Sequence, residues 1–142
     1  MATNALPEQV RSLFGNSRII GRRFKLVHVR YGREIIEVAT FRSHHEQAES
    51  DDQGLMEDGL ILRDNVYGTL EEDAIRRDFT VNALYYNIAD FSVVDFTTGM
   101  TDLESKKLRM IGEVETRLQE DPVRMLRAIR FAAKLQFNLE QE

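Results

Sequence analysis

Residues 120–135, EDPVRMLRAIRFAAKL, are the longest stretch of helical periodicity in this 142-residue sequence, and they constrain its fold most. Asp121 is a favoured N-cap residue and Pro122 suits the first helical position, so a helix is predicted to start here. The patterns that precede this segment are all short. The sequence therefore predicts one long C-terminal helix after a series of short strands and helices.

A first helix is predicted over residues 7–15, and a second starts at the capping box of Thr69 and Glu72. After Asp78, residues 79–88 fit either a helix capped by Asp78 or a strand, and the helix is preferred. A turn and short helix are predicted over residues 98–107. The predicted strands are residues 18–21, 24–30, 34–41, 92–96 and 108–112, with a tight hairpin between the second and the third.

The composition is that of one soluble globular unit, with 42% hydrophobic residues. The sequence has no apolar run near the ~20 residues that span a bilayer, and it has no signal segment at its start. It has no cysteine, which excludes disulfide partners and thiolate zinc sites and is compatible with a reducing cytoplasm. The pair His44–His45 is too small a ligand set for zinc.

The charge is unevenly distributed around a net value of −5. Residues 46–58 are strongly acidic, whereas residues 21–30 and 124–134 are basic. The segment from Arg42 to Asn65 lacks periodicity and is predicted to be an acidic loop. Local basic faces on an acidic protein favour binding of a defined anion, such as a triphosphate or an RNA end, over coating of DNA.

The basic residues of the C-terminal helix share one face. Arg124, Arg127 and Arg130 fall on one arc of roughly 120°. On spacing alone, an ordinary amphipathic helix with a solvated basic face is the favoured interpretation. The alternative is recognition, because arginine donors can pair with a base edge or a phosphate, and Asp121 adds an acceptor at the same end. The opposite side carries Met125, Ile129, Ala132 and Ala133.

Two further carboxylates are candidates for chemistry. Asp78 either caps a helix beside solvated arginines, or lies near a metal or a ribose hydroxyl with Arg76 and Arg77 neutralising phosphates. Glu37 lies within a strand of apolar residues, where burial of a carboxylate is costly without a partner. The alternative for Glu37 is an exposed position on an edge strand.

Three segments together resemble the class II nucleotidyltransferases, the family of bacterial poly(A) polymerases and CCA-adding tRNA nucleotidyltransferases. Residues 76–90, RRDFTVNALYYNIAD, resemble motif B, and residues 95–103, DFTTGMTDL, resemble motif C. Residues 120–135 resemble motif D, which selects the incoming base. Residues 19–30 and 34–46 are more similar to the poly(A) polymerase branch.

The resemblance implies an α+β fold. A nucleotidyltransferase head, a small mixed sheet flanked by helices, is expected over residues 1–112, and an all-helical neck is expected to begin in residues 113–142. The implied partners are ATP and RNA 3′ ends, and the implied cofactor is Mg²⁺. In the implied reaction an RNA 3′-hydroxyl attacks the α-phosphate of ATP beside two magnesium ions.

The family's motifs also imply roles for individual residues. Asp78 is the motif B acid, expected to be catalytic and a metal ligand, and Glu37 is a second catalytic candidate. The implied nucleotide-binding residues are Arg77 and Asn82 for ribose and phosphates, Asp121 and Arg124 for the base edge, and Arg127, which would brace that base edge or stack on it.

The family's N-terminal signature, a glycine-rich segment followed by Asp-x-Asp, does not occur in these 142 residues. The chain is therefore expected to be truncated at both ends and inactive alone, as part of a poly(A) polymerase. The alternatives are part of a CCA-adding enzyme, or a non-catalytic module that binds nucleotide or RNA.

Overall fold

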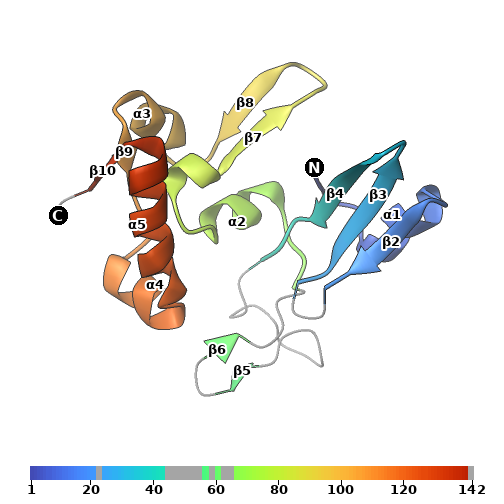
Figure 1. The fold of residues 1–142 in the computed structure, drawn as a ribbon, viewed down its shortest axis with the longest axis horizontal. Coiled ribbons are helices and arrows are strands. Elements are labelled where there is room, and N and C mark those ends of the chain that lie inside the picture. The colour runs from blue at the N-terminus through green and yellow to red at the C-terminus, as the bar shows by residue number, and fades with distance from the viewer. Residues whose placement is uncertain (22–23, 44–55, 58–59, 62–65, 141–142) are drawn as a thin grey trace. The chain divides into compact units, whose positions relative to one another are not determined.

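The computed structural model describes residues 1–21, 24–43, 56–57, 60–61 and 66–140. The chain divides into two compact units, Met1–Asp73 and Ala74–Glu142 (Figure 1). Each unit has a hydrophobic cluster of its own. Short strands alternate with helices along both units, which agrees with the α+β fold class expected from the sequence.

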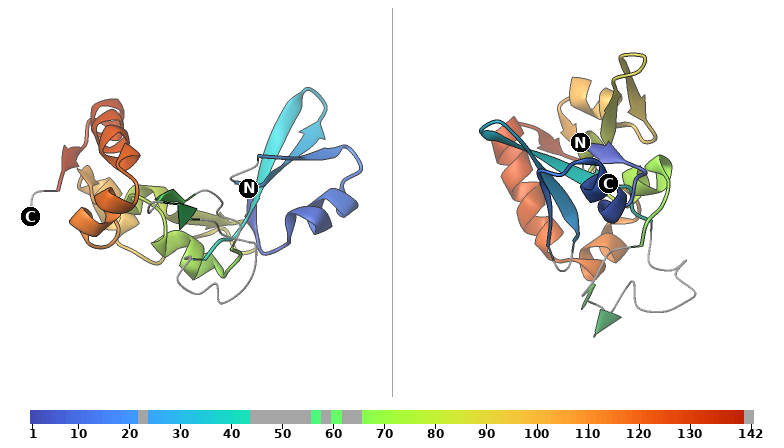
Figure 2. Two further views of the ribbon diagram at one scale, coloured as in Figure 1. Left: turned by 90° about the horizontal axis from the view of Figure 1, so that it is seen from below. Right: turned by 90° about the vertical axis from the view of Figure 1, so that its right-hand side faces the viewer.

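The elements of the first unit's sheet and its helix are β1 (Ala2–Thr3), α1 (Pro7–Leu13), β2 (Ser17–Ile20), β3 (Leu26–Tyr31) and β4 (Glu34–Thr40). The strand order is β1-β4-β3-β2. β1 runs parallel to β4 and the other neighbours are antiparallel, so the sheet is mixed as expected. The helix α1 lies against one face of this sheet (Figure 2).

Strand alternation decides which side chains reach the core of the first unit. Val27 and Val29 of β3 are buried with Val10 of α1. His28 lies between the two valines and therefore faces the other side of the sheet, where its cross-strand partner on β4 is Glu37. The predicted hairpin is confirmed, and its turn contains a glycine with positive φ.

The helix α2 (Leu70–Ile75) begins with the predicted capping box. The N–H of Thr69 donates to Glu72 Oε2 at 2.6 Å, and the N–H of Glu72 donates to the Thr69 hydroxyl at 3.2 Å. Asp73 Oδ1 accepts from the backbone N–H of Arg42 at 3.0 Å, which ties α2 to the residues that follow β4.

The segment from Arg42 to Asn65, predicted to be an acidic loop, lies largely outside the described residues. The pair His44–His45 also lies outside them. Within the segment, β5 (Met56–Glu57) pairs antiparallel with β6 (Leu60–Ile61). The acidic loop and the argument on the histidine pair therefore stay predictions.

The second unit joins a hairpin, three helices and a short parallel strand pair. Its core consists of Ala74, Ala83 and Ile111, with Tyr85 packed against them. The hairpin is formed by β7 and β8, and β9 pairs with β10 in parallel. The elements are η2 (Thr80–Asn82, a 3₁₀ turn), β7 (Leu84–Asn87), β8 (Ser92–Asp95), α3 (Gly99–Glu104), β9 (Lys107–Leu108), α4 (Val114–Glu120), α5 (Val123–Leu135) and β10 (Asn138–Leu139).

The preferred helix after Asp78 is wrong, because the chain there forms η2 and then the strand β7. The cause is pairing with a distant segment. The N–H of Thr80 donates to the carbonyl of Arg109, and the N–H of Ile111 donates to the carbonyl of Asp78, both at 3.0 Å. Backbone groups used in this way are not available to a helix. The predicted strand 108–112 is correspondingly reduced to β9 and a single bridge between Met110 and Phe79.

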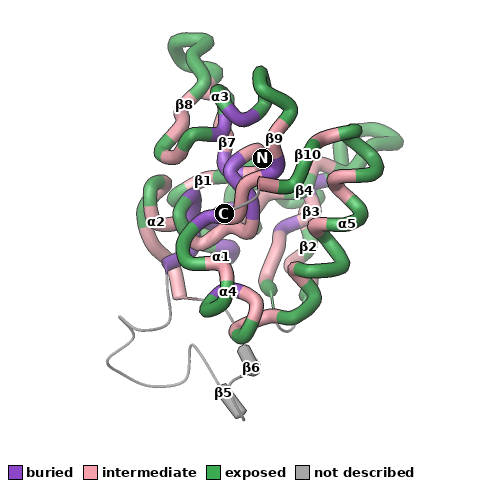
Figure 3. The backbone as a smooth tube through the Cα atoms, turned by 90° about the vertical axis from the view of Figure 1, so that its left-hand side faces the viewer, coloured by how far each residue is buried: buried purple, intermediate pink, exposed green. Residues whose placement is uncertain are grey.

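The long C-terminal helix is confirmed as α5, but it begins at Val123 with Pro122 as its N-cap, so the predicted N-cap at Asp121 lies one residue too early. Asp121 Oδ1 accepts from the N–H of Val123 at 3.2 Å. The orientation of α5 excludes a fully solvated basic face. The side chain of Arg124 is 12% exposed, whereas Ile129 is 63% exposed. Figure 3 shows that exposed and half-buried residues alternate along α5. The nearly buried charge of Arg124 is stabilised by its carboxylate partner, Glu120.

The predicted head of residues 1–112 and neck of residues 113–142 stay predictions. The two compact units divide the chain at a different place, after Asp73. Helix α4 begins at Val114, next to the predicted start of the neck. Among the described residues, no helix has the length and apolar content needed to cross a membrane.

Candidate functional site

Asp78 lies three residues beyond the end of α2 and contacts two of the other predicted site residues, Asn82 and Arg127. Its Oδ1 accepts from the backbone N–H of Phe79 at 2.9 Å and from Asn82 Nδ2 at 3.1 Å. Its Oδ2 accepts from Arg127 Nε at 2.5 Å. The side chain of Asp78 is 10% exposed. A nearly buried carboxylate is therefore neutralised by an arginine 49 positions further along the chain.

Arg77 is held against the start of β7. Its guanidinium lies over the ring of Tyr85, 5.0 Å from the ring centroid, and its Nε donates to the Tyr85 hydroxyl at 2.9 Å. Its Nη1 donates to the carbonyl of Asn82 at 3.0 Å. Arg77 and Asn82, which the sequence assigns together to the ribose and phosphates, are thus in contact.

The first turn of α5 brings Asp121 and Arg124 together, as the sequence predicts. The N–H of Arg124 donates to the carbonyl of Asp121 at 3.0 Å. Arg124 Nη1 donates to Glu120 Oε2 at 2.8 Å and to the carbonyl of Arg117. Within the described part of the chain, Arg124 Nη2 makes no hydrogen bond. One edge of the guanidinium is fixed by the protein and another can donate to a ligand.

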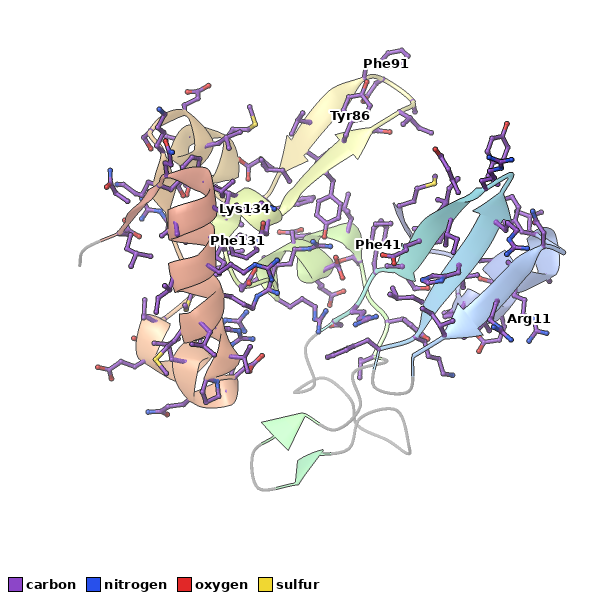
Figure 4. All side chains as sticks on the ribbon, in the orientation of Figure 1. Arg11, Phe41, Tyr86, Phe91, Phe131 and Lys134 are labelled. Atoms are coloured by element: carbon purple, nitrogen blue, oxygen red, sulfur yellow. The ribbon has the colours of Figure 1, made fainter. Side chains whose placement is uncertain are left out.

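Arg127 connects α5 to the segment around η2. Besides its ion pair with Asp78, its guanidinium lies 5.3 Å from the ring centroid of Phe131. Phe131, labelled in Figure 4, contacts Phe79 edge to face, with ring centroids 5.9 Å apart. These contacts fix α5 against Asp78, and the predicted role of Arg127 at the base edge stays a prediction.

Arg117 and Glu120 of α4 belong to this cluster, and the sequence argument missed both. Glu120 Oε2 accepts from Arg117 Nη1 at 2.9 Å as well as from Arg124 Nη1. Burial lowers the pKa of Arg117, and the charge of Arg124 lowers it further, whereas Glu120 and Asp78 act in the opposite direction. The signal available in the sequence was the i, i+3 and i, i+4 spacing of opposite charges.

Asp102 is a second residue that the sequence argument missed. Its carboxylate is 2% exposed and accepts from the hydroxyls of Thr80 at 2.8 Å and Thr98 at 2.9 Å, and from Arg109 Nε at 3.1 Å. Burial acts to raise the pKa of Asp102, but these hydrogen bonds outweigh it and the pKa is lowered. Asp102 thereby joins α3 and residue 109 to η2, the turn that carries Asn82.

Glu37 lies on β4 in the first unit, whereas the other predicted site residues lie in the second. Its Oε1 is 3.3 Å from Nε2 of His28, and its side chain is 66% exposed. Glu37 is not on an edge strand, because β4 pairs with β1 on one side and with β3 on the other. The exposure agrees with the alternative interpretation, but the edge position does not. Its catalytic role stays a prediction.

The donors around Asp78 do not fit a magnesium site. Magnesium prefers oxygen ligands in octahedral geometry, but both oxygens of Asp78 face N–H donors, one of them on a guanidinium. Among the residues that the structure describes, no group of three or more His, Asp or Glu side chains is arranged to hold a metal ion. The predicted metal role of Asp78 stays a prediction, and no step below depends on it.

Known proteins with similar sequences identify the family of this chain. Residues 1–109 match the sequence family described as the Poly A polymerase head domain. Poly(A) polymerase I of Salmonella typhimurium is 58% identical over 144 aligned positions, which cover 100% of this chain and 31% of the relative. The CCA-adding enzyme of Lactobacillus helveticus is 40% identical, over 100% of this chain and 33% of the relative.

A solved structure shows the same fold. The CCA-adding enzyme of Bacillus stearothermophilus in complex with CTP matches 98% of this chain and 31% of its own, with a TM-score of 0.78 at 32% identity. The chain belongs to the poly(A) polymerase head-domain family, whose members are nucleotidyltransferases. It spans about a third of the length of the curated relatives that it matches.

Proposed function

We propose that the protein carrying this chain adds adenylates to RNA 3′ ends without a template, with ATP as the donor. The observation that carries the proposal is the 58% identity to Poly(A) polymerase I over the whole chain, against 40% to a CCA-adding enzyme. Within this reaction, the second unit is proposed to select the incoming base. The isolated 142 residues are proposed to be inactive, because they contain no Asp-x-Asp pair.

The proposed base reader is the first turn of α5. The Asp121 carboxylate accepts from the amino group of the base, and Arg124 Nη2 donates to the neighbouring ring nitrogen. The guanidinium is suited to this role because Glu120 and the carbonyl of Arg117 already hold its Nη1. Prior fixing of a long side chain reduces the entropy that nucleotide binding has to remove.

Asp78, Arg77 and Asn82 are proposed to form the wall that faces the ribose and phosphates. Their mutual contacts support this role, because Asn82 receives a hydrogen bond from Arg77 and donates one to Asp78. Mg²⁺ is proposed as the cofactor of the full-length protein. Asp78 and Glu37 are kept as the proposed catalytic carboxylates of that protein.

The test is a chimera in which residues 1–142 replace the aligned segment of Poly(A) polymerase I of Salmonella typhimurium. An RNA primer, Mg²⁺ and one nucleotide at a time are supplied, and the rate of primer extension is measured. We expect extension with ATP and little with CTP, GTP or UTP. A chimera that unfolds cooperatively but extends the primer equally with ATP and CTP would refute adenylate selection by this chain.

Two arginine variants of the chimera test the base reader itself. Arg124→Ala is expected to raise the KM for ATP by about tenfold or more, as loss of a charged hydrogen bond does. Arg130→Ala is the matched control, because Arg130 lies on the same helix, is exposed and has no ion-pair partner among the described residues. Equal effects of the two substitutions would contradict the assignment of Arg124.

A second candidate function is CCA addition. Adenine and cytosine both present an amino donor beside a ring-nitrogen acceptor, so Asp121 and Arg124 alone do not separate them. The match to a CCA-adding enzyme in complex with CTP supports this candidate. Addition of CTP and then ATP to a tRNA that lacks its end would favour it. ATP binding without any extension would instead favour a non-catalytic module.

A further inference from the structure

Arg117 is a buried guanidinium to which no role has been given so far. It lies in the last turn of α4, and its side chain is 8% exposed. A buried charge is tolerated only when it is paired and hydrogen-bonded. Two of its three nitrogens have such partners, while Nε is buried without a hydrogen bond among the described residues. The arginine is therefore present at this position although its Nε donor is unsatisfied.

Arg117 holds the backbone that leads into Asp78. Its Nη2 donates to the carbonyls of Arg76 and Arg77, both at 2.7 Å. The carbonyl of Arg77 belongs to the same planar peptide unit as the nitrogen of Asp78. Fixing that oxygen fixes the orientation of the peptide, and with it the direction from which the Asp78 side chain leaves the backbone.

Arg117 also holds the base reader, by two routes. Nη1 of Arg117 and Nη1 of Arg124 both donate to Glu120 Oε2. Through the main chain, the carbonyl of Arg117 accepts from the same Nη1 of Arg124. A shift of Arg117 would therefore move Arg124 and the Asp78 peptide together.

We propose that Arg117 is a positioning residue of the nucleotide site, which sets the base-reading guanidinium of Arg124 in register with the segment that carries Asp78. This inference rests on the proposed function. Arg117 touches neither the base nor the phosphates in this role, and it acts through Arg124 and through the peptide of Asp78. Arg117 thus stabilises both the position of Arg124 and the orientation of the Asp78 peptide.

The test uses two substitutions in the chimera. Arg117→Lys keeps a positive charge but presents a point-like ammonium, which cannot serve two carbonyls and Glu120 in the geometry of a planar fork. Glu120→Gln leaves Arg117 in place, removes the shared charge and affects a more exposed side chain, so it carries less risk of unfolding. For each variant, kcat and KM are measured with ATP and with GTP, because guanine presents an acceptor and a donor where adenine presents a donor and an acceptor.

Both variants are expected to lower the preference for ATP over GTP in kcat/KM by about 10- to 100-fold, the size that misplacement by about 1 Å produces. The matched control is Asp95→Asn, which weakens another polar cluster of the same unit, at Thr97 and Met100, without contacting Arg124, Asp78 or η2. It is expected to lower the melting temperature but to leave the ATP-to-GTP ratio unchanged.

The outcomes separate this inference from the proposed function. If the unsubstituted chimera shows no preference for ATP, the proposed function fails. If the unsubstituted chimera prefers ATP and both variants keep that preference, the positioning role of Arg117 is overturned. The role is also overturned if Asp95→Asn lowers the preference as much as they do, because general loosening would then explain all three results.

Discussion

Asp102→Asn removes a buried negative charge from the second unit while keeping the shape of the side chain. The amide oxygen can still accept from the hydroxyls of Thr80 and Thr98, which lie 2.8 and 2.9 Å from Oδ2 of Asp102. Its NH₂ group, however, replaces the oxygen that lies 3.3 Å from Arg109 Nε. Two donors then face each other where the wild type has an ion pair.

The expected loss follows from these contacts. Hydrogen bonds to a charged acceptor contribute about 1.5–3 kcal/mol each, roughly twice as much as neutral ones. Arg109 is about one-third exposed and keeps Glu140, whose Oε1 lies 2.5 Å from its Nη1, so its part of the loss is small. Weakening of the two hydroxyl bonds and loss of the ion pair together lower the free energy of unfolding by about 2–3 kcal/mol at pH 7.

The difference between wild type and variant also depends on pH. The pKa of Asp102 is lower in the folded protein than its unfolded value, which is about 3.9 for an aspartate. The carboxylate therefore contributes stability above about pH 4, and that contribution is lost as the pH falls through the folded pKa. The variant has no such titration, so the stability difference is expected to be largest near pH 7 and to shrink below pH 4.

This difference is measured by urea unfolding of the unsubstituted chimera and of the chimera with Asp102→Asn. Unfolding is followed by circular dichroism at pH 7 and at successively lower pH. The midpoint of the variant is expected to shift to lower urea at pH 7, with an unchanged slope. A variant as stable as the wild type at pH 7 would refute the assigned contacts. A stability difference that stays constant from pH 7 to pH 3 would refute the electrostatic part of the reasoning.

Two further substitutions have matched controls within the chain. Gly99→Ala is expected to lower the free energy of unfolding by about 1–3 kcal/mol, because the new Cβ would lie 2.5 Å from a backbone carbonyl oxygen of η2. Gly15→Ala, with no atom within 4 Å of its Cβ, is expected to be nearly neutral in the same urea titration. Tyr85→Phe removes the hydroxyl that accepts from Arg77 and is expected to cost about 1 kcal/mol. The exposed Tyr86→Phe is its control in thermal unfolding, and a loss of equal size there would count against the Arg77 contact.

The sequence predicted those features whose signals are local. The capping box of Thr69 and Glu72 lies within one helical turn, and the start of α5 was predicted to within one residue from the local sequence. The contact of Asp121 with Arg124 also follows from helical spacing alone. Local hydrogen-bonding patterns of this kind persist whatever surrounds them, so they can be read from a few residues.

Features that depend on distant partners could not be predicted in this way. The residue types after Asp78 fit both a helix and a strand, and the decision was made by hydrogen bonds to Arg109 and Ile111. In the same way, nothing near Arg117 indicates that it binds carbonyls 40 and 41 positions earlier. Tertiary contacts of this kind override local propensity.

The long sequence separation of these contacts has a consequence for synthesis. Asp78 receives Arg127 only after 49 further residues have been added to the chain. At about 5–20 residues per second, the ribosome needs roughly 2–10 s to add them. Until then the Asp78 carboxylate lacks its arginine partner. The contacts between α5 and the segment around Asp78, the proposed nucleotide site, therefore form late in synthesis of these residues.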